Sequence, residues 1–148
     1  MVDKMEKRIK DFINKHHVLT LATSFGGNPW VANCFYAYME EQNSLIFTSS
    51  RDTRHIRDLE EGNRVAASIV LETSVIGKIQ GIQLMGNLFE PEGELLKKAN
   101  RVYKKRFPFA VLMDTTLWVL EIDFIKMTDN RLGFGKKLMW DKREEEGK

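Results

Sequence analysis

The sequence predicts an α+β domain dominated by β-structure, in which about six strands form a small barrel. One observation is length, because 148 residues suit a single domain with a real core and leave little room for a second. Another is a series of apolar, β-branched and aromatic segments separated by turn residues. The last is that few stretches repeat apolar residues at helical spacing.

The amino end predicts an amphipathic helix over about Asp3–Lys15. Met5, Ile9, Phe12 and Ile13 recur at helical spacing among charged residues. We therefore assign residues 1–12 to a helix that covers the barrel, residues 13–140 to the barrel itself, and the charged segment "DKREEEGK", residues 141–148, to a disordered tail.

The next three strands are expected to form a meander. The segments are "HVLTLAT", "WVANCFYAYM" and "LIFTSS", and the turn sequences "SFGGNP" and "EEQNS" separate them. A short helix should begin after Thr53 and end near Gly62, because glycine readily adopts the left-handed conformation that stops a helix.

The second half predicts three more strands and one helix. "RVAASIVL" is the fourth strand, "KIQGIQLMGNLFE" is a long fifth strand with a possible bulge at Gly81, and "LWVLEIDFIKMT" is the sixth. Leu95, Ala99 and Val102 repeat at helical spacing until "RFP" interrupts the pattern, which predicts a helix before the sixth strand.

Composition narrows the classes of function. The single cysteine, Cys34, cannot form an intramolecular disulfide, which favours a reducing, cytoplasmic environment. No apolar run is long enough to span a membrane, and a net charge of +2 provides little long-range attraction for a polyanion. We find no phosphate-binding P-loop, no metal-binding helix and no nucleophile elbow.

The stretch "FTSSRDTRHIRDLEEGNRV" gathers cations at the start of a helix, where the partial positive charge of free N–H groups opposes them. Ser49, Ser50 and Thr53 add hydroxyl groups, so the turn could form a cradle for a phosphate. The alternative is that Asp52 or Thr53 caps the helix and the arginines point into water.

The order of segments resembles the pyridoxamine-phosphate-oxidase-like, FMN-binding split-barrel superfamily. The resemblance is carried by "HVLTLATSFGGNPWVANCFYAY" and, more strongly, by "LIFTSSRDTRHIRDLEEGNRVAASI". "GIQLMG", "RFPFA" and "TDNRLGFGKKLMW" resemble a branch of that superfamily with no settled substrate. The resemblance implies a six-stranded, Greek-key-like split β-barrel with flanking helices, and a homodimer that holds FMN between its subunits.

The resemblance also implies which residues contact the cofactor. The phosphate ligands would be Thr48, Thr53, Arg54 and His55, with Ser49 and Ser50 as nearby donors. The strand that lines the flavin would offer backbone groups of Asn33, Cys34, Phe35 and Tyr36, and Gln83 would offer its amide to the pyrimidine edge. Thr128, Asn130 and Arg131 would approach the cofactor from the partner subunit.

Two departures from the superfamily bear on function. His55 replaces a common lysine, so phosphate affinity should weaken as the pH rises past the imidazole pKa. Ala37 replaces the lysine that lines the pyridoxal-phosphate site, and the substrate-side Tyr, Arg and Ser motif is missing. Oxidation of vitamin B6 is therefore not expected, although an FMN-dependent oxidoreductase acting on an unidentified small molecule is.

Two other functions stay open. One is a flavin-binding module that stores or senses redox state without turnover. The other is a nucleic-acid binder that uses the basic helix at 97–106, for which a solvated helix face is the preferred interpretation. FAD, heme or a deazaflavin could also replace FMN. His16 and His17 lack the spacing of a metal site.

Overall fold

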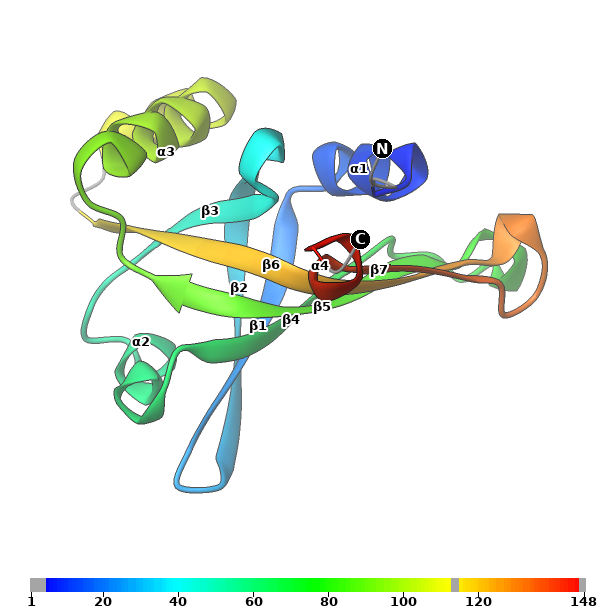
Figure 1. The fold of residues 1–148 in the computed structure, drawn as a ribbon, viewed down its shortest axis with the longest axis horizontal. Helices are drawn as coiled ribbons and strands as arrows, with labels where there is room; N and C mark the ends of the chain where they lie inside the picture. Colours follow the sequence, from blue (N-terminus) through cyan, green and yellow to red (C-terminus); the bar gives the residue numbers. More distant parts are fainter. Residues whose placement is uncertain (1–4, 113–114, 147–148) are drawn as a thin grey trace.

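The fold is a closed antiparallel barrel with helices around it (Figure 1), and it comes from a computed structural model that describes residues 5–112 and 115–146. The described strands are β1 (Val18–Phe25), β2 (Asn28–Met39), β3 (Ser44–Ser49), β4 (Arg64–Val70), β5 (Gln80–Phe89), β6 (Thr116–Asp129) and β7 (Lys137–Asp141). The described α-helices are α1 (Lys7–Lys15), α2 (Arg54–Arg57), α3 (Gly93–Arg106) and α4 (Lys142–Glu146).

The strand order is β3-β2-β1-β4-β5-β6-β7, and β3 also pairs with β6. Six strands therefore close on themselves, and β7 is an extra strand along β6. Because β4 pairs with β1 beside the β1–β2–β3 meander, the order is that of a Greek key. The predicted fold class is confirmed.

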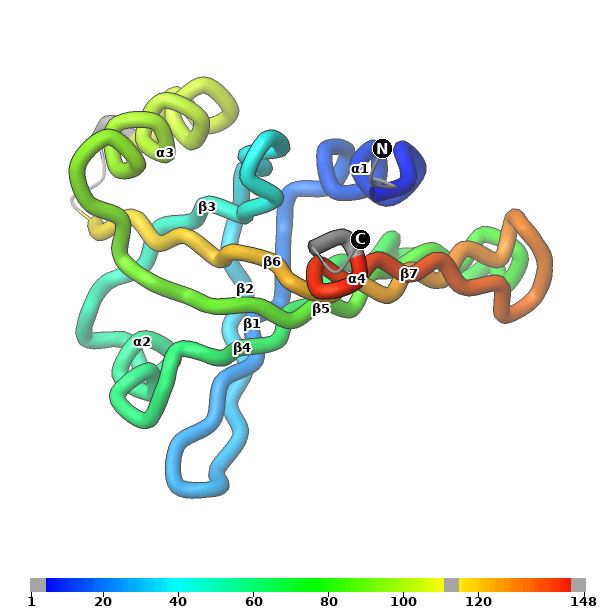
Figure 2. Tube along the Cα trace, in the orientation of Figure 1, coloured from blue at the N-terminus to red at the C-terminus, as the bar shows by residue number. Residues whose placement is uncertain are grey.

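Helix α1 covers the barrel as predicted. Ile9, Phe12 and Ile13 are buried in the main core, and the Tyr36 hydroxyl donates a 2.7 Å hydrogen bond to the Ile13 carbonyl oxygen. The helix begins at Lys7, and the predicted start at Asp3 lies outside the described residues. Helices α1 and α3 lie on one side of the molecule and α2 on the other (Figure 2).

The segment predicted as a disordered tail, residues 141–148, contains Asp141 at the end of β7 and helix α4 over Lys142–Glu146. Leu138 and Trp140, which the prediction placed in the barrel, lie on β7 and pack against the main core. The alternation "KLMWD" is too short to predict a strand alone, and pairing with β6 provides the missing hydrogen bonds. Residues 147–148 lie outside the described part.

The bulge in β5 occurs at a different glycine from the one predicted. The register with β6 shifts between Met85 and Gly86, whereas Gly81 pairs regularly with Val70 and Thr128. A Cβ added at Gly86 would lie 2.1 Å from the carbonyl oxygen of Glu121, so the two backbones meet at a distance that only glycine allows.

Beyond the barrel, β5, β6 and β7 extend as an arm that ends in two short 3₁₀ turns (Figure 1). The turns are Ile76–Lys78 and Asn130–Leu132, and Asn130 joins them by donating to the carbonyl oxygens of Ile76 and Ile79. Among the helices that the structure describes, none is long and apolar enough to cross a membrane.

Candidate functional site

The turn between β3 and α2 gathers hydroxyl groups around one histidine. Oγ of Ser49 lies 2.5 Å from Nε2 of His55, and Oγ1 of Thr53 lies 3.3 Å from the same nitrogen. The Thr53 hydroxyl also donates to the backbone carbonyl oxygen of Ser50 at 2.8 Å. Two of the four predicted phosphate ligands, Thr53 and His55, therefore converge with the predicted nearby donor Ser49, while Thr48 lies 3.5 Å from the Tyr103 hydroxyl.

The structure does not show the alternative arrangement, in which Asp52 or Thr53 caps α2 and the arginines point into water. Thr53 is the residue before α2, but its side chain makes no capping bond, and Asp52 accepts the Ser50 hydroxyl instead. Arg51 forms a bidentate pair with Glu90. Arg54 lies 4.2 Å from the centre of the Trp30 ring, which is a cation–π contact.

The N–H groups of the Arg54 guanidinium are therefore available to another partner. Within residues 5–112 and 115–146, no carboxylate pairs with Arg54, and its contact with Trp30 engages only the face of the guanidinium. A guanidinium held in place by an aromatic ring, with its N–H groups unpaired, is suited to binding an oxyanion.

His55 is buried, and burial lowers the pKa of its imidazole, while the nearby Asp58 carboxylate acts in the opposite direction. Asp58 is itself buried and accepts a 2.8 Å hydrogen bond from the Thr23 hydroxyl. The imidazole is therefore neutral near pH 7, and at the cradle it contributes a hydrogen bond and no full charge.

Gln83 lies on the outer face of the barrel, in a depression of about 390 Å³. On this face, residues that are paired across neighbouring strands form two adjacent rows. The apolar row contains Val31, Ala22, Ala66, Met85 and Phe124. The polar row contains Asn33, Thr20, Ser68, Gln83 and Lys126. The small side chains of Ala22, Ala66 and Ser68 line the middle of the depression, and no described residue bonds the Gln83 amide.

Strand β2 has an unpaired edge along much of its length. It pairs with β1 from Asn28 to Phe35, but it pairs with β3 only from Tyr36 onward. In the described part of the chain, no strand covers the other edge between Asn28 and Phe35. Half of the backbone N–H and C=O groups there are available to a ligand, in the segment predicted to line the flavin.

Alternation divides the four predicted residues of β2. Asn33 and Phe35 are exposed, and the Asn33 amide oxygen accepts a hydrogen bond from Thr20. Tyr36 is fully buried and Cys34 packs against the core, and the Tyr36 N–H donates to the His17 carbonyl oxygen. Backbone groups alternate in direction along a strand, so those of Cys34 and Tyr36 face β1 and those of Asn33 and Phe35 face the open edge. Burial raises the pKa of the Cys34 thiol to about 11, which keeps it protonated and unreactive.

Thr128, Asn130 and Arg131 lie on the arm, and each has a local role. The Thr128 hydroxyl accepts from Lys137, and Asn130 joins the 3₁₀ turns. Arg131 forms a bidentate pair with Asp129, a fully buried carboxylate that Arg8 also contacts. The structure therefore does not bring these three residues to the β3–α2 turn of their own chain, and none of them lines the depression at Gln83.

The basic helix is partly used for internal contacts. Lys97 pairs with Glu94, Lys98 pairs with Glu41, and Arg106 donates to three backbone carbonyl oxygens. Only Arg101, Lys104 and Lys105 of the predicted basic face keep unpaired charges within the described residues, a modest surface for a polyanion.

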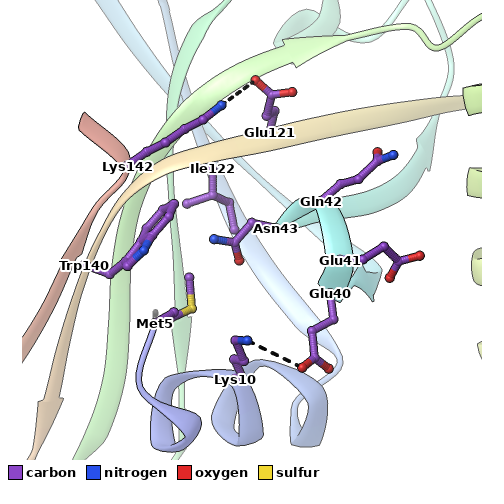
Figure 3. A pocket seen from close by; sticks show the side chains of 10 residues that line it. All are labelled: Met5, Lys10, Glu40, Glu41, Gln42, Asn43, Glu121, Ile122, Trp140 and Lys142. Atoms are coloured by element: carbon purple, nitrogen blue, oxygen red, sulfur yellow. Dashed lines mark ion pairs between the residues drawn. The ribbon is translucent and has the colours of Figure 1, made fainter. Parts of the chain in front are cut away.

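The cavity in Figure 3, of about 840 Å³, was not predicted from the sequence. Its walls come from α1, the turn after β2, β6 and β7, four segments that are far apart in the chain. Both of its lysines pair with glutamates of the same lining, Lys10 with Glu40 and Lys142 with Glu121, and Glu41 pairs with Lys98 outside it. No local pattern marks such a cavity, because it exists only where the four segments meet.

Comparison with known proteins identifies the family of the chain. Residues 5–128 match the pyridoxamine 5'-phosphate oxidase family. A UPF0306 protein from Photorhabdus laumondii is 39% identical over 134 residues, which cover 90% of this chain and 94% of that protein.

Solved structures show the same fold at low sequence identity. A heme-binding protein from Mycobacterium smegmatis superposes with a TM-score of 0.76 at 19% identity, covering 98% of this chain but only 62% of that one. An FAD-binding protein from Mesorhizobium loti superposes with a TM-score of 0.68 at 15% identity, covering 86% of this chain and 95% of that one.

Proposed function

Because the chain belongs to the pyridoxamine 5'-phosphate oxidase family, we propose that it binds FMN and uses it as an oxidoreductase on a small molecule. The observation that carries this proposal is the β3–α2 turn, where Ser49, Thr53 and His55 converge beside an arginine without a carboxylate partner. Such a group of donors fits a phosphate monoester better than it fits an uncharged ligand.

The outer face of the barrel supports the rest of the cofactor. A planar ring can lie on the small side chains of Ala22, Ala66 and Ser68, and the unbonded amide of Gln83 can bond the polar edge of the ring. The open edge of β2, from Asn28 to Phe35, can supply backbone donors and acceptors to the same ring.

A second copy of the chain is part of the proposal. The phosphate turn and the Gln83 depression share no lining residue, and the arm with Asn130 and Arg131 extends away from the barrel (Figure 1). In a two-fold dimer the arm of one subunit could approach the cofactor of the other. Exposed Val31 and Met85 on the outer face would then become buried.

The protein part of the chemistry is binding and access. When bound, the flavin would supply the redox step, and the chain would hold its phosphate, orient its ring and limit the approach of water. Ala37 is buried and has no charged group, so it cannot bind a substrate as the lysine at this position would. We therefore expect a substrate other than a B6 vitamer. A module that holds flavin without turnover is the alternative, and reduction of bound flavin by NADH or NADPH distinguishes the two.

The first experiment is an absorbance spectrum of the purified protein, followed by titration with FMN and riboflavin. Arg54→Ala should weaken FMN binding roughly ten- to a hundredfold, because a charge-assisted contact is worth about 1.5–3 kcal/mol. Riboflavin, which lacks the phosphate, should be unaffected. Arg57→Ala is the matched control, because Arg57 is exposed on the same short helix and should change neither affinity.

Two results would refute the proposal. Equal affinities of the unmodified protein for FMN and riboflavin would remove the phosphate cradle. A heme spectrum without any flavin binding would assign the fold to a different cofactor.

A further inference from the structure

A second polar cavity, of about 380 Å³, lies between α3, the end of β3 and the start of β6. Its polar lining includes Thr48, Asn100, Tyr103, Lys104, Thr115 and Thr116. A volume of this size suits a small molecule of metabolite size.

This cavity differs from the larger one in how its polar groups are used. In the cavity of Figure 3, the lysines pair with glutamates inside the same lining. Here, by contrast, the side chains of Asn100, Thr115 and Thr116 make no hydrogen bond to any described residue, and Lys104 has no ion pair there. Among the residues that the structure describes, Thr48 alone contacts the Tyr103 hydroxyl, at 3.5 Å.

Asn100, Thr115 and Thr116 are half-buried and Lys104 is exposed, so their polar groups are available to water or to a ligand. The group available here combines a cation, several hydroxyls and an amide, which together match an oxyanion attached to a hydroxylated carbon chain. We propose that this cavity binds a small phosphorylated or carboxylated molecule that carries hydroxyl groups.

The rim contributes a second cation. Arg51 lines the same cavity, and its partner Glu90 lies on the rim as well. Because the Arg51 and Glu90 side chains are 67% and 41% exposed, their pair contributes little stability and can open at low cost. An incoming anion would then contact both Arg51 and Lys104.

The inferred site adjoins the proposed flavin site, because Thr48 is a predicted phosphate ligand and Arg51 lies in the β3–α2 turn. Arg54 and His55 do not line this cavity, and neither Lys104 nor Asn100 belongs to the β3–α2 turn. Each proposal can therefore fail without the other.

The test is a titration of the flavin-free, full-length protein with glycerol 3-phosphate, followed by ¹H–¹⁵N NMR. We expect the side-chain amide of Asn100 and the backbone amides of Thr115 and Thr116 to shift together. Uncharged glycerol should leave them unchanged. Lys104→Gln should weaken binding at least about fivefold, because one charge-assisted contact is lost.

Matched variants separate this site from general charge effects. Lys105→Gln removes an exposed lysine from the same helix, but one that does not line the cavity, so it should alter affinity less than about twofold. Arg54→Ala should have no effect. The inference is overturned if the three amides do not respond, if Lys105→Gln weakens binding as much as Lys104→Gln, or if binding depends on Arg54.

Discussion

Nε2 of His55 lies 2.5 Å from the Ser49 hydroxyl, so one hydrogen bond joins the end of β3 to the first turn of α2. Either group can be the donor in this contact, because a hydroxyl donates to a bare Nε2 and accepts from a protonated one. Burial lowers the pKa of His55, which favours the neutral ring at the proposed phosphate cradle.

Stability should depend on pH through His55. Its pKa in the folded protein is lower than the ordinary value of 6.5, so between these two values the unfolded chain binds more protons. The contribution of His55 is complete above pH 6.5 and decreases as the pH falls toward the folded pKa. Urea unfolding between about pH 7.5 and pH 5.5 should show a smaller loss of stability in His55→Asn than in the unmodified protein.

His17 provides the comparison for that experiment, because its pKa is also lowered but its side chain is exposed. His17→Asn should keep most of the pH dependence. If His55→Asn keeps the full dependence as well, His55 is not the group that titrates.

Gly86 should be far less tolerant of alanine than Gly81. At Gly86 the added methyl group would meet the Glu121 backbone at 2.1 Å, whereas at Gly81 its nearest neighbour is 3.5 Å away. Gly86→Ala should lower the free energy of unfolding by about 1–3 kcal/mol or more, because two strands must separate. Gly81→Ala should cost less than about 1 kcal/mol, as measured by urea unfolding. Equal losses would argue against the bulge at Gly86.

Arg131 and Arg8 allow a structural role to be separated from a role at the cofactor. Both guanidinium groups contact the buried Asp129 carboxylate, so alanine at either position should lower stability by about 1 kcal/mol. If Arg131 also reaches the partner's cofactor, Arg131→Ala alone should weaken FMN binding, by about three- to tenfold. Isothermal titration of both variants gives the answer, and equal FMN affinities would return Arg131 to a purely structural role.

The outer face of the barrel should be the dimer interface. Light scattering should give about twice the chain mass of 17.2 kDa. Met85→Glu should produce monomers, because a two-fold axis would bring two carboxylates near one apolar surface. Phe109→Glu is the control, since Phe109 is 82% exposed on the turn after α3, outside this face. A dimer that survives Met85→Glu would move the interface elsewhere.

The sequence alone predicted the elements whose signal is local. Alternating apolar residues placed six strands correctly, and helical spacing placed α1 and α3, because each pattern reflects one face of one element. The hydroxyls of Ser49 and Thr53 were placed in one turn by the sequence as well, whereas His55 was added only by the family resemblance, and all three lie within seven consecutive residues.

Only the tertiary structure decided the relations between distant segments. The pairing of β3 with β6 and the stacking of Arg54 on Trp30 each join residues that are far apart in the chain. The open edge of β2 likewise depends on where β3 begins to pair with it. The glycine of the bulge is another example, since Gly81 and Gly86 look alike until the Glu121 backbone lies against one of them. A local pattern specifies which face of an element is apolar, but the partner of that face is chosen by packing of the whole chain.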